Sequence, residues 1–132
     1  MLTVGDTAPS FTLTAQDKSI FSSEEHSGTR MLVVFYPAAF TGVCTEEMCS
    51  FSDLMGDLEK AGCIVVGISV DAPFSNAAFA ESNEIGFPLL SDVHRSVIND
   101  FGVAYQDFSI KGYTVATRSV FVLSLIHISE PT

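Results

Sequence analysis

Three short segments of the chain are almost entirely apolar and lack the polar alternation of a half-exposed strand. They are residues 31–36 (MLVVFY), 64–70 (IVVGISV) and 119–123 (SVFVL). Runs of this kind predict strands that are buried on both faces, as in a sheet covered by helices on its two sides. We predict these segments as the central strands and residues 11–13 as an N-terminal edge strand.

Helical spacing of apolar residues follows the first of these strands. The expected helix covers residues 42–61, and Gly62 provides a C-terminal stop. Its apolar positions are Met48, Phe51, Leu54, Met55 and Leu58. Shorter helices are predicted over residues 74–83 and 94–101, and residues 104–117 form the least regular stretch. Strands that alternate with helices predict one α/β domain, and no repeat or linker divides it.

Composition narrows the class of protein. Of 132 residues, 47% are apolar and 17% are charged, which suits one packed domain. No apolar run is long enough to cross a bilayer, and residues 1–10 lack a secretory signal pattern, so we expect a cytoplasmic protein. Sixteen acidic and six basic residues give a net charge of −10, which disfavours nucleic acid and anionic membranes as partners.

Candidate chemistry resides in the three cysteines, Cys44, Cys49 and Cys63, whose odd number argues against a disulfide scaffold. Cys44 is expected in the first helical turn, where free N–H groups and the helix dipole stabilise a thiolate and lower the thiol pKa. Glu46 and Glu47 oppose this effect, so a nearby cation is needed. On position alone, a small buried unreactive cysteine remains the alternative.

A sequence motif favours a reactive Cys44 over an unreactive one. Pro37, Thr41 and Cys44 form the pattern Pro-x-x-x-Thr-x-x-Cys directly after a buried strand, which resembles the active-site signature of the peroxiredoxin (AhpC/TSA) family. MLVVFYP, VVGISVDAPFSNAAF, FPLLSD and TRSVFVL also match in order, so the resemblance spans residues 4–122. It implies a thioredoxin-like α/β fold with a central mixed sheet covered by helices. It also implies a thiol-dependent peroxidase that reduces hydrogen peroxide and organic hydroperoxides without a cofactor or metal.

The resemblance implies a role for each matching residue. Cys44 would be the peroxidatic cysteine, which attacks the distal peroxide oxygen and becomes a sulfenic acid. Thr41 would hydrogen-bond the thiolate and the peroxide, and Pro37 would shield the sulfur from water. Arg118 would lower the pKa of Cys44 and stabilise the leaving oxygen, and Glu47 would orient these groups. The simpler alternatives are a surface charge for Arg118 and a good helix former for Glu47.

Cys49 follows Cys44 by five residues, as in the peroxiredoxin Q (bacterioferritin comigratory protein) subgroup, which makes it the implied resolving cysteine. Five helical residues rise about 7.5 Å and turn about 500°, whereas disulfide-bonded Cα atoms lie roughly 4.4–6.8 Å apart. The helix must therefore unwind around residues 45–48 in each cycle. The alternatives are a one-cysteine enzyme resolved by an external thiol and an inactive truncated fragment. Thioredoxin or a similar dithiol is the expected reductant of a monomeric or homodimeric enzyme.

Other functions fit these residues less well. Cys44, Cys49, His26 and His94 could supply four metal ligands, but zinc-binding cysteines usually have two to four residues between them in a loop, not a helix. A disulfide oxidoreductase of the same fold would need Cys-x-x-Cys, which is absent. A redox-sensing module without turnover is a further alternative. Cys63 begins a buried strand with no cation nearby in sequence, so we expect a structural role for it.

The resemblance ends near Val122, where the family continues with a partner strand and a C-terminal helix. Residues 123–132 (LSLIHISEPT) instead match the translation of a transposon-type sequencing adapter. We therefore predict a C-terminally truncated domain over residues 1–122, followed by a non-native tail over 123–132. Without the missing elements the last strand would have an unpaired edge and one sheet face would be bare, so poor folding is expected. The apolar tail could itself add strand-like pairing.

Overall fold

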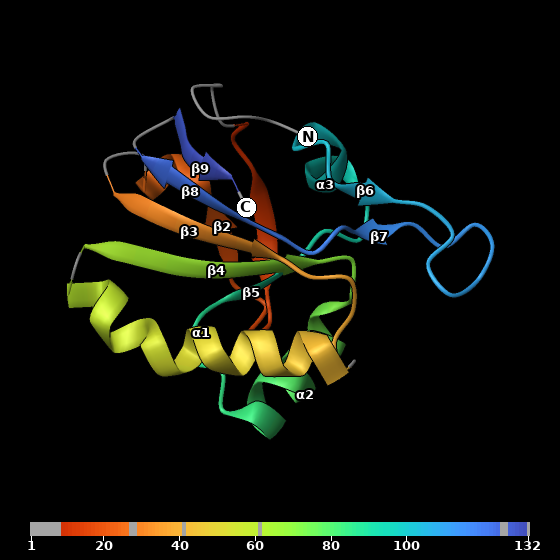
Figure 1. The fold of residues 1–132 in the computed structure, drawn as a ribbon, viewed down its shortest axis with the longest axis horizontal. Helices are drawn as coiled ribbons and strands as arrows, with labels where there is room; N and C mark the ends of the chain where they lie inside the picture. Colours follow the sequence, from red (N-terminus) through yellow and green to blue (C-terminus); the bar gives the residue numbers. More distant parts are fainter. Residues whose placement is uncertain (1–8, 27–28, 41, 61, 125–126, 132) are drawn as a thin grey trace.

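The structure, a computed structural model, describes residues 9–26, 29–40, 42–60, 62–124 and 127–131. Its main feature is a mixed seven-stranded sheet with the order β2-β1-β5-β4-β3-β8-β9 (Figure 1). The strands are β1 (Thr12–Ala15), β2 (Ile20–Ser22), β3 (Arg30–Phe35), β4 (Cys63–Ser69), β5 (Leu89–Ser91), β8 (Ser119–Ser124) and β9 (His127–Pro131). A separate pair comprises β6 (Ala104–Tyr105) and β7 (Val115–Ala116). The helices are η1 (Ser23–His26), α1 (Gly42–Lys60), α2 (Pro73–Asn83) and α3 (Ser96–Asp100).

The α/β architecture and the three central strands are confirmed, as β4, β3 and β8 lie side by side. The edge position expected for residues 11–13 is wrong, because β1 pairs with β5 on one side and with β2 on the other. The third helix begins at Ser96 instead of residue 94, because Arg95 has a φ of 63° and cannot continue a right-handed helix. Residues 104–117 are irregular except for β6 and β7.

Alternation along β3 divides the interior into two layers. Its odd-numbered residues from Met31 to Phe35 pack in the core with residues of α3. Its even-numbered residues and Tyr36 pack in a second core with residues of α1 and α2. Figure 1 shows α1 and α2 together on one side of the sheet. Both faces of β3 are thus buried, as the uninterrupted apolar run predicts.

The layer on the α3 side is not bare, which corrects the expectation for that sheet face. The rings of Phe35, Phe101 and Phe121 are fully buried there. Their centroids lie 5.2 to 5.7 Å apart in tilted and edge-to-face arrangements. Such aromatic contacts add about 0.5–1.5 kcal/mol per pair to the stability gained from burial.

The last strand of the predicted domain is paired along the edge that was expected to be open. β9 lies antiparallel to β8, with Leu123 opposite Ile128 and Ser124 opposite His127. The tail therefore supplies the strand-like pairing that its apolar sequence allows. This pairing covers backbone N–H and C=O groups that an edge strand would otherwise expose.

Gly67 allows α1 to lie close to the sheet. A Cβ atom at this position in β4 would lie 2.7 Å from the Met48 Cε atom and 2.9 Å from a Leu89 methyl carbon. Both distances are shorter than van der Waals contact, so a larger residue would displace these side chains. The Met48 side chain is fully buried against this glycine, and it fixes the first half of α1 on the sheet.

Candidate active site

Three segments that are distant in sequence meet at one end of the central strands of the sheet. β3 and β4 are parallel and end together, with Phe35 opposite Ile68. β8 runs antiparallel to β3 and begins there, with Ser119 opposite Phe35. Three parts of the chain therefore lie at the same end of these strands: the loop from β3 to α1, the segment after β4, and Arg118 before β8. In open α/β sheets, ligands usually bind beyond the carboxyl ends of the strands.

Cys44 is the third residue of α1. The first helical turn contains no acidic residue, and its backbone N–H groups have no partners within the helix. Such a position favours a thiolate over a thiol. The helical placement expected for Cys44 is therefore confirmed. Thr41, and the side chains of Cys44 and Glu47, lie outside the part of the chain that the structure describes.

Pro37 and Arg118 line a common pocket of about 300 Å³. Pro37 is buried two residues after the end of β3, and Arg118 is exposed just before β8. These two residues stand 81 positions apart (118 − 37), and the pairing of β3 with β8 brings them together. A proline and a guanidinium from the predicted set thus share one cavity beside the loop that leads into α1.

The rest of this pocket has apolar walls from the segment around β6 and β7. Tyr105, Phe108 and Val115 line it, with Ala116 and Thr117 completing the wall. The Tyr105 and Phe108 rings meet edge to face, with centroids 6.3 Å apart. About half of the Tyr105 side chain is exposed, whereas Val115 and Ala116 are fully buried. The cavity therefore combines one cation with an aromatic and aliphatic lining.

Cys49 lies further along α1 on the side that faces the end of α2. Its thiol is free and half-buried, and Sγ is 3.9 Å from both the backbone and side-chain oxygens of Asn83. Three residues on, the Ser52 hydroxyl donates to the Glu84 carbonyl at 3.1 Å and accepts from the Gly86 N–H at 3.2 Å. The helix is continuous from Gly42 to Lys60, so it holds Cys44 and Cys49 in one unbroken segment.

Comparisons with known proteins show the family to which the chain belongs. The family model of the AhpC/TSA family matches residues 4–125. A protein of Mycobacterium tuberculosis that is named as a peroxiredoxin is 45% identical over 124 residues, which are 92% of this chain and 78% of that protein. The chain belongs to the peroxiredoxin family.

Solved structures place this peroxiredoxin more closely. The crystal structure of peroxidoxin BcpB from Mycobacterium tuberculosis has a TM-score of 0.91 and 31% identity, covering 100% of this chain and 86% of that one. A bacterioferritin comigratory protein of Xanthomonas campestris, described for its alkyl peroxide reduction activity, has a TM-score of 0.84 and 26% identity over 92% of this chain and 79% of that one. Other relatives bear the names Bcp and peroxiredoxin Q. The thioredoxin-like fold and the expected subgroup are confirmed.

The third cysteine of the peroxiredoxin lies inside the sheet. Cys63 is the first residue of β4 and is 6% exposed. Burial raises the pKa of its thiol, and the nearby Arg30 guanidinium only partly opposes this shift. The thiol therefore stays protonated and weakly nucleophilic near neutral pH, consistent with the structural role expected for it.

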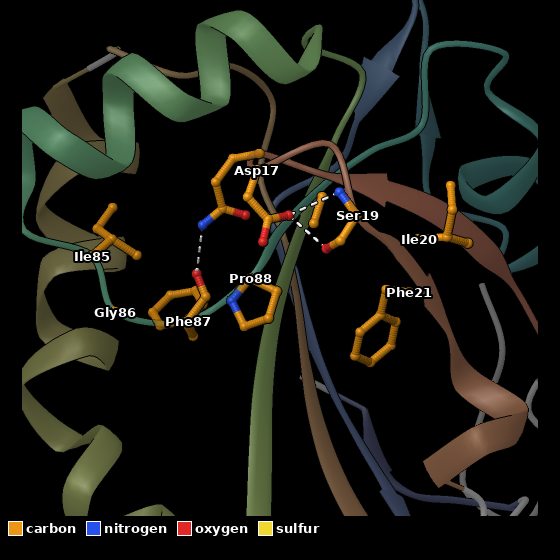
Figure 2. Close-up of a pocket in the computed structure, with 10 residues that line it drawn as sticks. Asp17, Ser19, Ile20, Phe21, Ile85, Gly86, Phe87 and Pro88 are labelled. Carbon is orange, nitrogen blue, oxygen red and sulfur yellow. Dashed lines mark hydrogen bonds between the residues drawn. The ribbon is translucent and has the colours of Figure 1, made fainter.

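A second pocket of about 300 Å³ lies at the other side of the peroxiredoxin, where the β1–β2 hairpin faces residues 85–88. Figure 2 shows Asp17 and Ser19 in the hairpin turn opposite Phe87 and Pro88. The Gln16 amide spans this gap, because it donates to the Phe87 carbonyl and accepts from the Leu89 N–H. No residue of the predicted site lines this pocket.

The metal-site alternative depended on two histidines. His26 stacks on the Phe21 ring with centroids 4.9 Å apart, and His94 is exposed before α3. Among the described side chains, no three His, Cys, Asp or Glu residues are grouped as metal ligands.

Within the described part of the chain, no helix has the length and apolar character of a membrane span.

The aromatic wall of the pocket and a polar group beside the β3–α1 loop were not predicted from the sequence. Tyr105 and Phe108 belong to a stretch without any periodic pattern, so nothing in it indicated a pocket. Asp71 lies in the matching segment VVGISVDAPFSNAAF, and its carboxylate accepts the Ala39 N–H at 2.8 Å. Its position two residues after β4 could have indicated a role in the site, because polar groups that follow parallel strands gather at the carboxyl ends of those strands.

Proposed function

We propose that this peroxiredoxin reduces hydrogen peroxide and organic hydroperoxides with Cys44 as the reacting thiol. The thiolate attacks the distal peroxide oxygen, the O–O bond breaks, and the leaving alkoxide or hydroxide takes up a proton. Cys44 is thereby oxidised to a sulfenic acid, and the peroxide is reduced to an alcohol or water. The observation that carries the proposal is the common pocket of Pro37 and Arg118 beside the loop that leads into α1, whose third residue is Cys44.

Arg118 would stabilise both the thiolate and the charge on the leaving oxygen, because a guanidinium interacts favourably with each anion. Pro37 would keep water from the reacting sulfur. Thr41 would hydrogen-bond the thiolate and peroxide, and Glu47 would orient the neighbouring groups. The last two assignments rest on the family motif alone.

The apolar lining of the pocket supports organic hydroperoxides as substrates alongside hydrogen peroxide. The partly exposed rings of Tyr105 and Phe108 offer a surface for an alkyl or aromatic substituent next to the guanidinium. A hydroperoxide could then direct its polar end toward Arg118 and its carbon chain toward the rings. The activity described for the similar Xanthomonas campestris protein agrees with this substrate class.

We further propose that Cys49 resolves the sulfenic acid. Its thiol attacks the Cys44 sulfur, water leaves, and a disulfide forms that thioredoxin or a similar dithiol reduces. In an ideal helix, Cα atoms five residues apart are separated by about 8–9 Å, which exceeds the roughly 4.4–6.8 Å of a disulfide. The first turns of α1 must therefore open. A reducing compartment such as the cytoplasm would supply such a dithiol and keep the cysteines reduced between cycles.

Turnover with a dithiol reductant tests this function directly. Reduced protein, thioredoxin, thioredoxin reductase and NADPH are expected to consume hydrogen peroxide and cumene hydroperoxide with oxidation of NADPH. The Cys49→Ser variant should react with the first peroxide equivalent within about twofold of the wild-type rate but should lose thioredoxin-linked turnover, because no internal disulfide can form. Sustained turnover by Cys49→Ser would instead establish a one-cysteine enzyme. No peroxide consumption by the wild type would refute the peroxidase assignment.

Oxidation is also expected to reduce helix content. Closing a 44–49 disulfide requires unwinding near residues 45–48 of a 19-residue helix, so far-UV circular dichroism near 222 nm should weaken on adding one peroxide equivalent. The Cys49→Ser variant is the matched control, and its spectrum should not change. Identical spectra for both redox states, with the disulfide proven by mass spectrometry, would contradict the unwinding.

A further inference from the structure

The loop from β3 to α1 is attached to other parts of the chain by hydrogen bonds. Its described residues, 36–40, contain no helix or strand. Phe40 has a φ of 66°, in the left-handed region that bulky L-residues avoid. Its ring is 57% exposed and meets the Phe79 ring edge to face, with centroids 5.3 Å apart. The contacts that hold this strained segment therefore bear on its course into α1.

Two side chains outside the loop supply hydrogen bonds at its two ends. At the first end, the fully buried Tyr36 hydroxyl donates to Asn76 Oδ1 at 2.7 Å. Asn76 is itself fully buried, and its amide donates to the Ser91 hydroxyl at 3.2 Å. At the other end, Asp71 Oδ2 accepts the Ala39 N–H at 2.8 Å. Pro37 lies between these two attachment points.

The Asp71 carboxylate is itself held in place. The fully buried Ser69 hydroxyl donates to Oδ2 at 2.9 Å, and the Asp71 N–H donates to the same hydroxyl at 3.2 Å. Hydrogen bonds to a carboxylate are shorter and stronger than those between neutral groups. Ser69 is the last residue of β4, a central strand of the sheet. The carboxylate that accepts the Ala39 N–H is therefore held in place by this strand.

We propose that Asp71 is a positioning residue of the peroxidase, which sets the approach of the α1 N-terminus to the Pro37–Arg118 pocket by holding the Ala39 N–H. This inference rests on the proposed role of Cys44, which stands five residues after Ala39. Arg118 is positioned by β8 and the start of α1 by this loop, so their alignment depends on the loop conformation. Cleavage of the O–O bond requires the thiolate sulfur, the peroxide oxygens and the guanidinium to be aligned. A displacement of about 1 Å can lower the rate about 100-fold.

Three variants at this position separate the hydrogen bond from the charge. Asp71→Ala removes the acceptor and is expected to lower the rate constant with hydrogen peroxide by about tenfold or more. Asp71→Asn retains an oxygen that can accept from Ala39 and Ser69, so its rate should stay within about threefold of the wild type. Asp71→Glu keeps the charge but moves the carboxylate, and it should lose about fivefold or more even if Asp71→Ala proves too unstable to assay.

Asp17 provides a matched control in the hairpin turn. Its Oδ1 accepts the N–H and the hydroxyl of Ser19, the same pair of donor types that Asp71 accepts. Asp17→Ala should therefore lose comparable bonds without lowering the peroxide rate. Alkylation by iodoacetamide, which needs only a thiolate, should fall less in Asp71→Ala than the peroxide rate does.

The chain contains no tryptophan, so the rates are best measured by competition with horseradish peroxidase for hydrogen peroxide. The inference fails if Asp71→Ala keeps its rate within twofold of the wild type, if Asp71→Asn falls as far as Asp71→Ala, or if Asp17→Ala falls equally. A Cys44→Ser variant measured in parallel distinguishes a failure of the role proposed for Asp71 from a failure of the proposed peroxidase function. If that variant reacts like the wild type, the proposed function itself is wrong.

Discussion

Cys44→Ser is expected to lower the rate constant for peroxide reduction by about 1,000-fold or more, to the level of uncatalysed loss. The sulfur is both the nucleophile and the group that carries the transferred oxygen, and a serine hydroxyl is not deprotonated near neutral pH. Removing an essential nucleophile typically costs several orders of magnitude in rate. Competition with horseradish peroxidase measures this loss for the single-turnover reaction.

Cys63→Ser is the matched control, since it replaces a thiol by the same hydroxyl elsewhere in the chain. Because burial raises the pKa of Cys63, that thiol is largely protonated at pH 7 and reacts little with peroxide. The control should therefore keep the wild-type rate. A Cys44→Ser variant that still formed a sulfenic acid and reduced peroxide would show that another residue carries the reaction.

Arg118→Ala is expected to lower the same rate constant by about 100- to 1,000-fold. Preorganised donors that stabilise charge in the transition state contribute about this much when one is removed. The pKa of Cys44 should rise in this variant, because the favourable interaction of the thiolate with a cation is lost. Arg118→Lys should recover part of the rate, since it restores a positive charge but not the planar fork of donors.

Arg30→Ala serves as the control for removing a positive charge from the surface. Arg30 is exposed and begins β3 at the end opposite to the Phe35–Ser119 pair. Its loss should leave the peroxide rate within about twofold, because exposed charges far apart are screened by salt. The thiolate absorbance near 240 nm, followed against pH, reports the pKa. If Arg118→Ala matched Arg30→Ala in rate and in pKa, Arg118 would be only a surface charge.

The sequence predicted the central part of the fold because apolar pattern and burial coincide there. Uninterrupted runs at β3, β4 and β8 fill the middle of the sheet, and the helical spacing in α1 marks a helix with a fully buried Met48. The three-residue strands β2 and β5 escaped prediction, because so few residues carry no periodicity. The start of α3 was misplaced because the left-handed backbone of Arg95 leaves no signal in the side-chain pattern.

The candidate site was predictable only where a motif fixes residue type and spacing. Pro37 and Arg118 were named from the family pattern, and strand pairing brings them to one pocket. Asp71 could not be assigned in the same way, because its partner is the backbone N–H of Ala39. Any residue other than proline offers that donor, so no side chain marks the contact.

The burial of Met48 against Gly67 bears on the energetics of the redox cycle. Unwinding residues 45–48 to close the proposed disulfide would draw this side chain out of the core, which costs about 1.5–3 kcal/mol for a fully buried methionine. The oxidised form loses that stabilisation and the dithiol form keeps it. For a two-electron couple, this difference corresponds to about 30–65 mV toward a more oxidising reduction potential. The packing of one thioether would thus make the bond easier for an incoming dithiol to break.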